Sequence, residues 1–299
     1  MAGNTGQNVF GQIADIGLPI GTQLHECYQI MDYLSAGHIS LVYLAETKGG
    51  KKSRKVLIKE FCPFTLANRD LDFKTVVCKG KAYKKQFCHE KEMFDRECMI
   101  AAQLQKMPER EKRYIANYIE DFQENETRYL VLEFVPGIDL KQYIKMGKTL
   151  SFKKTVRTLI RVIENLHKIG ILHRDMKPSN IIVKEDGEVV IIDFGSACFS
   201  KNEDKEVPFV SKGFSAPELY VNEKTTNLTD NYSVGAIVYY LLTGVVPQSA
   251  EKRLKKDELK NISSYIDIPF VLEHIIMKCL ELCPKKRLKK LKVLYYLLL

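Results

Sequence analysis

The sequence predicts an α+β protein in which a small strand-rich lobe precedes a larger, mostly helical lobe. Residues 28–60 contain three segments rich in β-branched and aromatic residues, separated by Gly and Lys turns, as is typical of antiparallel strands. Residues 151–170 show the apolar periodicity of an amphipathic helix, and the pattern from about residue 214 onward is helical with loops. The change in character follows Pro136-Gly137.

These strand-like and helix-like sequence patterns predict the domain organisation. Residues 1–26 are expected to form a loose lead-in, and residues 27–299 a single domain without internal repeats. Its N-terminal lobe would span residues 27–133, followed by a hinge at 133–138 and a C-terminal lobe over 139–299.

The N-terminal lobe is predicted to combine strands with one helix. An irregular insert over 61–89 contains one short extended segment, and apolar positions at nearly helical spacing predict a helix over 90–106. A turn is expected at "ENET". The extended segments are expected at 28–34, 40–47, 55–61, 74–78, 114–123 and 128–135.

The C-terminal lobe should open on the helix that follows Ser151. Ser151 is a plausible N-cap, because its side-chain oxygen can accept from the free N–H groups of the first turn. Gly170 is a plausible stop, because glycine adopts the left-handed conformation that ends many helices.

Composition limits the classes of protein that this chain can represent. No apolar run reaches about 18 residues, and the longest candidate, residues 234–246, is too short to span a membrane. The polar, Gly-rich N-terminus is not a secretory signal. Eight scattered cysteines without a C-x-x-C pair are expected to be thiols. These features predict a cytoplasmic location.

The net charge of +9 leaves two interpretations open. Basic runs at 48–55 and 285–292 indicate either a patch for nucleic acid or another anion, or simply a solvated surface. No zinc-finger or aromatic RNA-binding motif accompanies the lysines, so nucleic acid is not the expected partner. Cys279 and Cys283 lack two further ligands at a suitable spacing for a metal.

The stretch "ILHRDMKPSN", residues 171–180, crowds polar groups directly behind a buried-looking apolar pair. Burying such groups costs too much unless they are paired or used. A second acidic turn follows an apolar strand at Asp193. Asn180 and Asp193 carry the oxygen donors that Mg²⁺ prefers. Asp175 then remains to orient a hydroxyl or receive its proton, and Lys177 to offset phosphoryl charge.

An upstream lysine also needs an explanation. Lys59 ends the apolar strand "VLIKE", and an interior lysine requires an anionic partner. Glu97, within the predicted helix, is the preferred partner because an apolar face follows it, although Glu90 and Glu92 compete for the role. Between the first two strands, the turn in "LSAGHISLVY" could present backbone amides to phosphate oxygens.

Taken in order, these motifs resemble those of the protein kinase family. The matching stretches are His173 to Asn180 for H-R-D-x-K-x-x-N, Asp193-Phe194-Gly195, and Ala216-Pro217-Glu218. The resemblance covers roughly residues 28–298. The lysine two positions after Asp175 resembles serine/threonine kinases, and the insert after Lys59 resembles a bacterial subgroup.

The resemblance implies a two-lobed protein-kinase-like fold, with a small antiparallel-sheet N-lobe containing one key helix. It also implies ATP and Mg²⁺ as cofactors, and transfer of the γ-phosphate to serine or threonine hydroxyls of protein substrates, including the chain itself. Lys59, held by Glu97, would bind the α- and β-phosphates, and Asn180 and Asp193 would hold Mg²⁺. Asp175 would orient the acceptor hydroxyl and take its proton, and Lys177 would offset the charge of the γ-phosphate.

The same resemblance assigns the nucleotide contacts. Backbone groups of Glu133 and Val135 would bind the adenine, with Leu132 as gatekeeper, and the turn in "LSAGHISLVY" would be the phosphate turn. The full set of implied nucleotide-contacting residues is Leu34, Ser35, Gly37, Val42, Leu57, Lys59, Leu132, Glu133, Val135 and Ile182.

Structural pairings are implied as well. Asp230 would tie the helix after 229 to the catalytic loop, His173 would pack under Phe194, and Arg287 would pair with Glu218.

The sequence departs from the family pattern in three places. The three glycine positions of the phosphate turn read Ser35, Gly37 and Ser40, which adds side-chain bulk near the phosphates. Leu57 stands where the family usually has Ala above the adenine. The segment between D-F-G and A-P-E has no Thr or Tyr, and its hydroxyls belong to Ser196, Ser200, Ser211 and Ser215.

The last departure bears on regulation. In the family, the arginine at the position of Arg174 is satisfied by a phosphate on this segment. Ser200 is the expected autophosphorylation site, whereas Ser211 matches a position whose free hydroxyl contacts the catalytic residues. In the alternative, carboxylates of Glu203, Asp204 or Glu206 serve Arg174 without any phosphate.

Two other functions remain as rivals. A pseudokinase would keep the fold without catalysis, and only the thin phosphate turn favours it. A small-molecule phosphotransferase would use a related fold, but the A-P-E element and Asp230 favour a protein acceptor. The substrate protein, the activating stimulus and the oligomeric state are not encoded in any motif.

Overall fold

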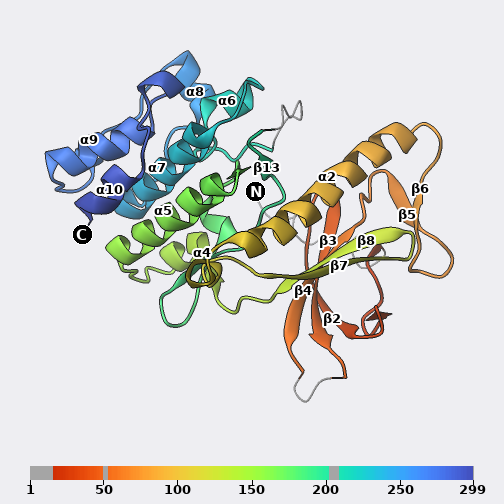
Figure 1. Ribbon diagram of the computed structural model, residues 1–299. Coiled ribbons are helices and arrows are strands. Elements are labelled where there is room, and N and C mark those ends of the chain that lie inside the picture. The colour runs from red at the N-terminus through yellow and green to blue at the C-terminus, as the bar shows by residue number, and fades with distance from the viewer. Residues whose placement is uncertain (1–15, 50–52, 202–208, 299) are drawn as a thin grey trace, which may run out of the picture. The chain divides into compact units, whose positions relative to one another are not determined.

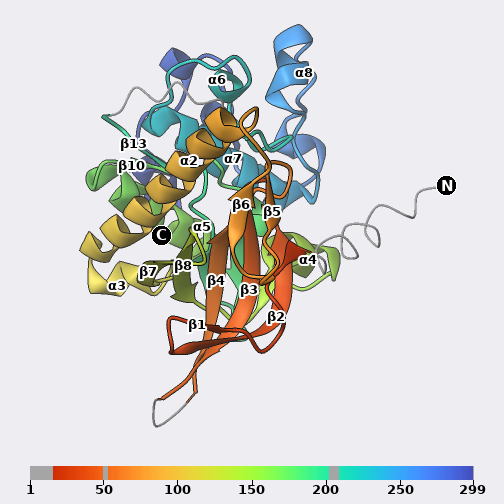
Figure 2. The same ribbon diagram turned by 90° about the vertical axis from the view of Figure 1, so that its right-hand side faces the viewer.

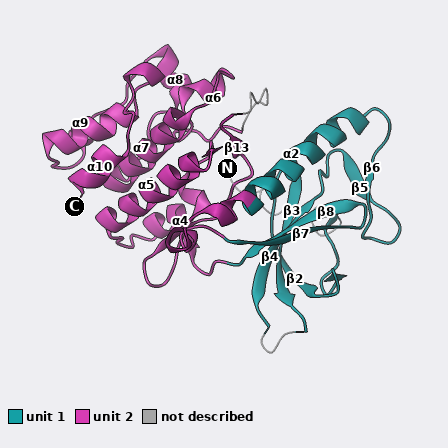
Figure 3. Ribbon diagram, viewed as in Figure 1, with its two compact units in different colours: residues 1–102, 117–134 teal, residues 103–116, 135–299 magenta. Residues whose placement is uncertain are grey.

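A computed structural model describes residues 16–49, 53–201 and 209–298. The chain separates into two compact units (Figure 3). Unit 1 comprises residues 1–102 and 117–134, and unit 2 comprises residues 103–116 and 135–299. The chain crosses from unit 1 to unit 2 for the last time between residues 134 and 135, within the segment 133–138 that was predicted as a hinge. The limits of the lead-in and of the two lobes remain predictions.

Unit 1 is built on a six-stranded antiparallel sheet with the strand order β1-β2-β3-β4-β8-β7 (Figure 1). A separate hairpin, β5–β6, lies within the insert that precedes the helix α2. The strands are β1 (Gln23–Leu24), β2 (Tyr28–Ala36), β3 (Ser40–Thr47), β4 (Lys55–Phe61), β5 (Ala67–Arg69), β6 (Val76–Cys78), β7 (Tyr118–Glu124) and β8 (Thr127–Glu133).

The described part of the lead-in is not loose, contrary to expectation. Leu18 and Leu24 are fully buried in the core of unit 1, and β1 pairs with β2. These apolar side chains cover the face of the sheet formed by Ile30 and Tyr43. Their burial is what attaches residues 16–26 to the sheet, because isolated short strands gain little stability by themselves.

Alternation along β4 sends successive side chains to opposite faces of the sheet. Val56 and Ile58 enter the larger core, and Phe61 enters a second core together with Phe94 of α2. Lys59 shares the α2 face with Phe61, whereas its neighbour Glu60 points to the other face. The strand pattern therefore separates two adjacent charged residues into two different environments.

The helix α2 spans Lys84–Gln103 and continues into a 3₁₀ turn at Leu104–Lys106. It begins six residues before the predicted start at residue 90, because its first turns are polar and show little apolar periodicity. Phe87 nevertheless anchors this early part, with its ring centroid 5.2 Å from that of Phe61. The insert also contains two strands rather than the one predicted, since a three-residue strand such as β5 leaves no readable alternation.

A charged network lies within the larger core of unit 1. Glu60 is fully buried and accepts hydrogen bonds from the hydroxyls of Tyr43 at 2.6 Å and Tyr129 at 2.8 Å. Arg69 of β5 donates to the same carboxylate at 2.7 Å. The network thus connects β3, β4 and β8 to the hairpin of the insert.

Replacing Arg69 by Ala should lower the free energy of unfolding by about 3–5 kcal/mol, because it leaves the Glu60 carboxylate buried without its cation. Chemical denaturation of the parent and variant measures this difference. Arg54→Ala is the matched control, because Arg54 is exposed and its loss should change stability by less than about 0.5 kcal/mol. Equal effects of the two substitutions would show that the buried pair contributes nothing.

Unit 2 is mostly helical (Figures 1 and 2). Its helices are α3 (Glu109–Lys112), α4 (Leu140–Lys145), α5 (Phe152–Lys168), α6 (Pro217–Tyr220), α7 (Asn227–Thr243), α8 (Ala250–Lys255), α9 (Phe270–Cys279) and α10 (Lys292–Leu297). Short strands pair as β12-β11-β9 and β10-β13. These strands are β9 (Ile138–Asp139), β10 (Ile171–Leu172), β11 (Ile181–Val183), β12 (Val189–Ile191) and β13 (Cys198–Phe199).

The helix predicted after Ser151 is α5. Ser151 occupies its N-cap position, although its side chain makes no capping hydrogen bond. Gly170 has a φ of +77° and ends the helix as predicted. One face of α5 is buried, which is the origin of its apolar periodicity.

The helix α7 is the central buried helix of unit 2. Thr226 and Thr229 form a capping box at its start, and most of the following residues are buried. Gly235 is required there, because a Cβ would lie 2.4 Å from the Cβ of Cys279 in α9. The apolar run 234–246 therefore belongs largely to an internal helix. Among the described residues, no helix is long and apolar enough to cross a membrane.

Candidate active site

A buried carboxylate holds the predicted catalytic segment, residues 173–180 of unit 2, in place. Asp230 of α7 accepts hydrogen bonds from the backbone N–H groups of His173 at 3.0 Å and Arg174 at 2.9 Å. Its Oδ2 also lies 2.8 Å from Nε2 of His167. Burial alone would raise the pKa of Asp230, but the bonds from His167 and from the His173 backbone lower it. The expected tie between this helix and the catalytic segment is present.

The backbone of the segment is strained at Arg174, which has a φ of +63°. Residues other than glycine adopt this conformation at a cost that the surrounding structure must offset. Asp230 supplies part of that compensation by binding the Arg174 N–H. This left-handed conformation of Arg174 turns the chain immediately before Asp175.

Both carboxylate oxygens of Asp175 are engaged. Lys177 Nζ donates to Oδ2 at 2.5 Å, and the Ser211 hydroxyl donates to Oδ1 at 2.7 Å. Asn180 Nδ2 donates to Oδ2 at 3.2 Å. The side chain is only 8% exposed, so these bonds form in a nearly dry environment. An ordered carboxylate with an adjacent hydroxyl is the geometry that hydroxyl activation requires.

Asn180 and Asp193 lie at the same end of two paired strands. The register places Ile181 of β11 opposite Ile191 of β12, and Ile192 N donates to the Asn180 carbonyl at 3.0 Å. The Asn180 amide nitrogen faces Asp175, which leaves its side-chain oxygen for another partner. Asp193 Oδ1 accepts from Gly195 N at 3.1 Å. This set of oxygen donors fits Mg²⁺, although the role itself remains a prediction.

His173 and Arg174 have structural environments. The imidazole of His173 is fully buried, and its ring centroid lies 5.0 Å from that of Phe194, as expected. Burial lowers the pKa of His173, which keeps the ring neutral. Arg174 is 4% exposed, and its Nε donates to the Ser196 carbonyl at 2.7 Å. The guanidinium is thereby attached to the segment that follows D-F-G.

Within unit 1, Lys59 pairs with Glu97. Lys59 Nζ lies 2.6 Å from Glu97 Oε1, and the two side chains are 12% and 5% exposed. The competing acids are placed elsewhere: Glu92 is exposed, and Glu90 accepts from Gln86. The expected partner is therefore the observed one. The contribution of the pair to catalysis remains a prediction.

The predicted nucleotide contacts of unit 1 share one face of the sheet. The register places Val42 opposite Lys59, and Leu57 opposite Leu132, so all four side chains point to the same side. Glu133 N donates to the Asn117 carbonyl at 2.8 Å. An adenine contact at Glu133 would therefore be made by its carbonyl oxygen.

The phosphate turn joins β2 to β3. Leu34 and Ser35 are exposed, and Gly37 N donates to the Ser40 carbonyl at 2.8 Å. A Cβ at Gly37 would make only ordinary contacts, the nearest at 3.5 Å from that carbonyl. Gly37 is therefore not required by the turn itself, and its value would lie in leaving room for a ligand.

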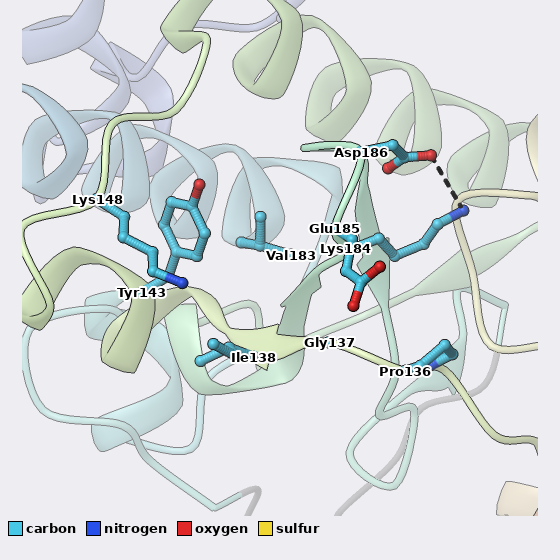
Figure 4. Close-up of a pocket in the computed structure, with 9 residues that line it drawn as sticks. All are labelled: Pro136, Gly137, Ile138, Tyr143, Lys148, Val183, Lys184, Glu185 and Asp186. Atoms are coloured by element: carbon cyan, nitrogen blue, oxygen red, sulfur yellow. Dashed lines mark ion pairs between the residues drawn. The ribbon is translucent and has the colours of Figure 1, made fainter.

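The remaining predicted contacts belong to unit 2. Ile182 is half-buried on β11, opposite Asp139 and Val190, and Val135 is also half-buried. A pocket of about 810 Å³ lies beside β9 and β11 (Figure 4). Its lining includes Tyr143 and Val183 but none of the predicted catalytic or metal-binding residues. This hollow is thus separate from the catalytic cluster.

The four serines of the segment after D-F-G have different environments. Ser215 is buried, and its hydroxyl accepts from Ser211 N at 2.7 Å. Ser211 binds Asp175, and the Ser196 carbonyl binds Arg174. Ser200 is exposed, and its N–H donates to the Gly170 carbonyl at 2.8 Å. Glu203, Asp204 and Glu206, the alternative partners for Arg174, lie outside the described residues.

The A-P-E glutamate makes the expected pair with an arginine. Arg287 Nη1 and Nη2 lie 2.7 and 3.0 Å from the two oxygens of Glu218, and both residues are buried. The Thr229 hydroxyl donates to the same carboxylate at 2.8 Å. The basic run 285–292 is therefore mixed: its arginine is internal, and Lys285, Lys286, Lys289, Lys290 and Lys292 are exposed.

Sequence reasoning missed two groups of residues. The first is the buried network of Glu60 and Arg69, for which the signal was an acid at an apolar position of an alternating strand. The second is Lys141 and Lys212, which line a pocket beside the catalytic segment. No pattern in the sequence indicates that second group, because the two lysines lie on different elements.

Residues 61–296 match the family model for the protein kinase domain. The chain belongs to the protein kinase family. This match begins two residues after Lys59, so the phosphate turn and that lysine lie outside it. The identification rests on the larger part of the domain, which includes all of residues 173–180, the predicted catalytic segment.

Curated relatives of this kinase domain include bacterial proteins. It is 29% identical over 294 residues to a "Probable serine/threonine-protein kinase" of Clostridium perfringens, covering 91% of this chain and 38% of that protein. It is 28% identical over 287 residues to a kinase of the same description from Clostridium acetobutylicum, covering 90% of this chain and 39% of that protein. The expected resemblance to bacterial serine/threonine kinases is confirmed. The chain spans well under half the length of these relatives.

A solved structure titled "PpkA-294 apo form" shares the fold, with a TM-score of 0.78 and 24% identity. The alignment covers 95% of this chain and 99% of that structure. The predicted fold class, an antiparallel sheet with one helix followed by a mostly helical part, is confirmed.

Proposed function

We propose that the chain is an ATP- and Mg²⁺-dependent protein kinase that phosphorylates serine or threonine hydroxyls of protein substrates. The observation that carries the proposal is the environment of Asp175, a nearly buried carboxylate bonded to Lys177 and to a serine hydroxyl. The Ser211 hydroxyl shows that an alcohol fits against Oδ1 at hydrogen-bonding distance. The names of the bacterial relatives support the acceptor class.

The chemistry proposed for unit 2 is proton transfer and charge neutralisation. Asp175 accepts the proton of the acceptor hydroxyl as the new O–P bond forms, while the bond between the γ-phosphorus and the bridging oxygen of the β-phosphate breaks and ADP leaves with that oxygen. Lys177, whose Nζ lies 2.5 Å from Asp175 Oδ2, places a positive charge beside the transferred phosphoryl group. Asn180 and Asp193 would hold Mg²⁺, which supplies positive charge to the phosphate oxygens when bound.

The role proposed for unit 1 is nucleotide binding. Lys59, positioned by Glu97, binds the α- and β-phosphates of ATP, and Val42, Leu57 and Leu132 contact the adenine. Ile182 and Val135 of unit 2 are proposed to contribute further adenine contacts. Two hydroxyl-bearing residues, Ser35 and Ser40, occupy glycine positions in the phosphate turn, so ATP affinity should be modest.

A transfer assay with radiolabelled ATP, Mg²⁺ and general protein acceptors tests the proposal. Transfer to serine or threonine supports it. Nucleotide binding, read as a thermal shift, without transfer would instead identify a pseudokinase. Transfer to sugars or aminoglycosides but not to proteins would identify a small-molecule phosphotransferase.

A cytoplasmic location remains a prediction, supported by eight free thiols.

Autophosphorylation at Ser200 is the regulatory prediction. Ser200 is exposed, whereas Ser215 is buried and Ser211 is bonded to Asp175. After incubation with ATP and Mg²⁺, mass spectrometry should find phosphate on Ser200, and Ser200→Ala should lower activity. Fully active enzyme with unmodified Ser200 would contradict this and would favour the acidic residues that follow.

A further inference from the structure

A pocket of about 320 Å³ in unit 2 borders the catalytic segment and is rich in positive charge. Lys177 lines it from the segment itself, Lys141 from α4, and Lys212 from the stretch before A-P-E. Phe214 and Tyr240 provide apolar surface. Their rings pack edge to face with centroids 5.9 Å apart. The pocket therefore combines apolar walls with a basic rim.

The position of the pocket relates it to the acceptor hydroxyl. Ser211 also lines the pocket, and its hydroxyl lies 2.7 Å from Asp175 Oδ1. A peptide whose hydroxyl reaches Asp175 must therefore pass beside this pocket. Because consecutive residues of an extended chain are about 3.3–3.6 Å apart, the side chain that enters belongs to a residue close to the acceptor.

Two of the lysines are available to a ligand. The charge of Lys177 is balanced by that of Asp175, since Lys177 Nζ lies 2.5 Å from Asp175 Oδ2. Lys141 and Lys212 are exposed, and within the described residues neither forms a salt bridge with a carboxylate. They therefore supply positive charge that the proposed phosphoryl transfer does not use.

One further carboxylate lies near the pocket, that of Asp139. It raises the pKa of Tyr240, although burial contributes more to that shift. Its side chain caps α4, accepting from Gln142 N at 2.9 Å. Asp139 is thus bonded to the helix terminus, and its single negative charge is outweighed by the two lysines, Lys141 and Lys212, that line the pocket.

We propose that this pocket selects protein substrates that carry Asp or Glu within two residues of the phosphorylated hydroxyl. The proposal rests on the proposed kinase function. Lys141 and Lys212 would bind the substrate carboxylate, and Phe214 and Tyr240 would contact its methylene groups. A basic side chain at the same position would meet like charges and be rejected.

Matched synthetic peptides test this selectivity. Each peptide has one serine acceptor in a neutral background. Glu, Gln or Lys is placed, one position at a time, at the first or second residue before the serine or at the first or second residue after it. We expect kcat/KM for Glu to exceed that for Gln by about tenfold at one position, with Lys lower still. High salt should reduce the preference, because the lysines are exposed. Equal kcat/KM for all three residues at every position would overturn the proposal.

Variants then connect the preference to the two lysines. Lys141→Glu combined with Lys212→Glu should abolish the preference for Glu and favour the Lys peptide. Lys153→Glu is the matched control, because Lys153 is exposed on α5 and does not line the pocket. It should leave the parental preference intact. Parental selectivity in the double variant would rule out these lysines as the determinants.

Failure of the selectivity differs from failure of the kinase function. An enzyme that phosphorylates Glu, Gln and Lys peptides equally is a kinase without this selectivity. A chain that phosphorylates no acceptor contradicts the proposed function. In that case fluorescence anisotropy of the labelled peptides still tests the pocket, since the Glu peptide should bind the parent about tenfold more tightly than the Gln peptide, and equal affinities would refute the selectivity.

Discussion

Asp175→Asn is expected to lower kcat by about 10²- to 10⁴-fold, the range that a positioned acid or base contributes. The substitution removes the proton acceptor but nearly keeps the shape of the side chain. The amide oxygen can still accept from Lys177, and its NH₂ group can face the Ser211 hydroxyl, which can act as an acceptor. The fold and the affinity for ATP should therefore change little.

Steady-state kinetics with saturating peptide measures the loss, and a nucleotide titration checks that ATP binding persists. Asp186→Asn is the matched control, because Asp186 is exposed and lies outside the catalytic cluster. It should retain parental turnover. Parental turnover in the Asp175 variant would remove this residue from the mechanism.

Lys59→Ala should reduce kcat/KM by about a hundredfold or more, because it removes the cation proposed to bind the phosphates. Glu97→Ala should produce a smaller loss, since it only releases Lys59 from the position fixed by the 2.6 Å contact. If the two residues act as a unit, the double variant should be little worse than Lys59→Ala.

The double-mutant cycle is read from kcat/KM and, separately, from the melting temperature, which reports any general damage to unit 1. Glu92→Ala supplies the control on the same helix. Glu92 is exposed, so its effect should add to that of Lys59→Ala. Strict additivity for Glu97 would show that it does not position the lysine, and Glu90 would become the next residue to test.

Some properties of this protein are determined by the sequence alone, because they depend on short-range patterns. The alternation of β4 separates Lys59 from Glu60, and the residues from His173 to Asn180 bring the groups around Asp175 into one short segment. Helix-forming periodicity defines α5, and Gly170 defines its end. These features follow from the backbone periods of 2.0 and 3.6 residues, which are visible without any long-range contact.

Most partners that are distant in sequence could be named only where the family resemblance supplied them. Asp230 with His173 and Glu218 with Arg287 are such pairs, whereas Glu97 was already the preferred partner of Lys59 because an apolar face follows it. That pattern favours Glu97 but does not settle the choice, since Glu90 and Glu97 lie seven residues apart on one helix and both are buried. The fold decides, because the α2 face opposite β4 places one carboxylate, and not the other, beside the lysine.

Only the tertiary structure shows that Lys141 and Lys212 line the same pocket as Ser211, and that Arg69 reaches the buried Glu60. Lys141, Lys212 and Arg69, each taken alone, have the sequence pattern of an ordinary surface charge. Burial and proximity depend on chain segments far apart in sequence, and local periodicity carries no information about those distances. The sequence thus determined the fold class and the catalytic segment, whereas long-range packing decided which charges are buried and which remain available to a substrate.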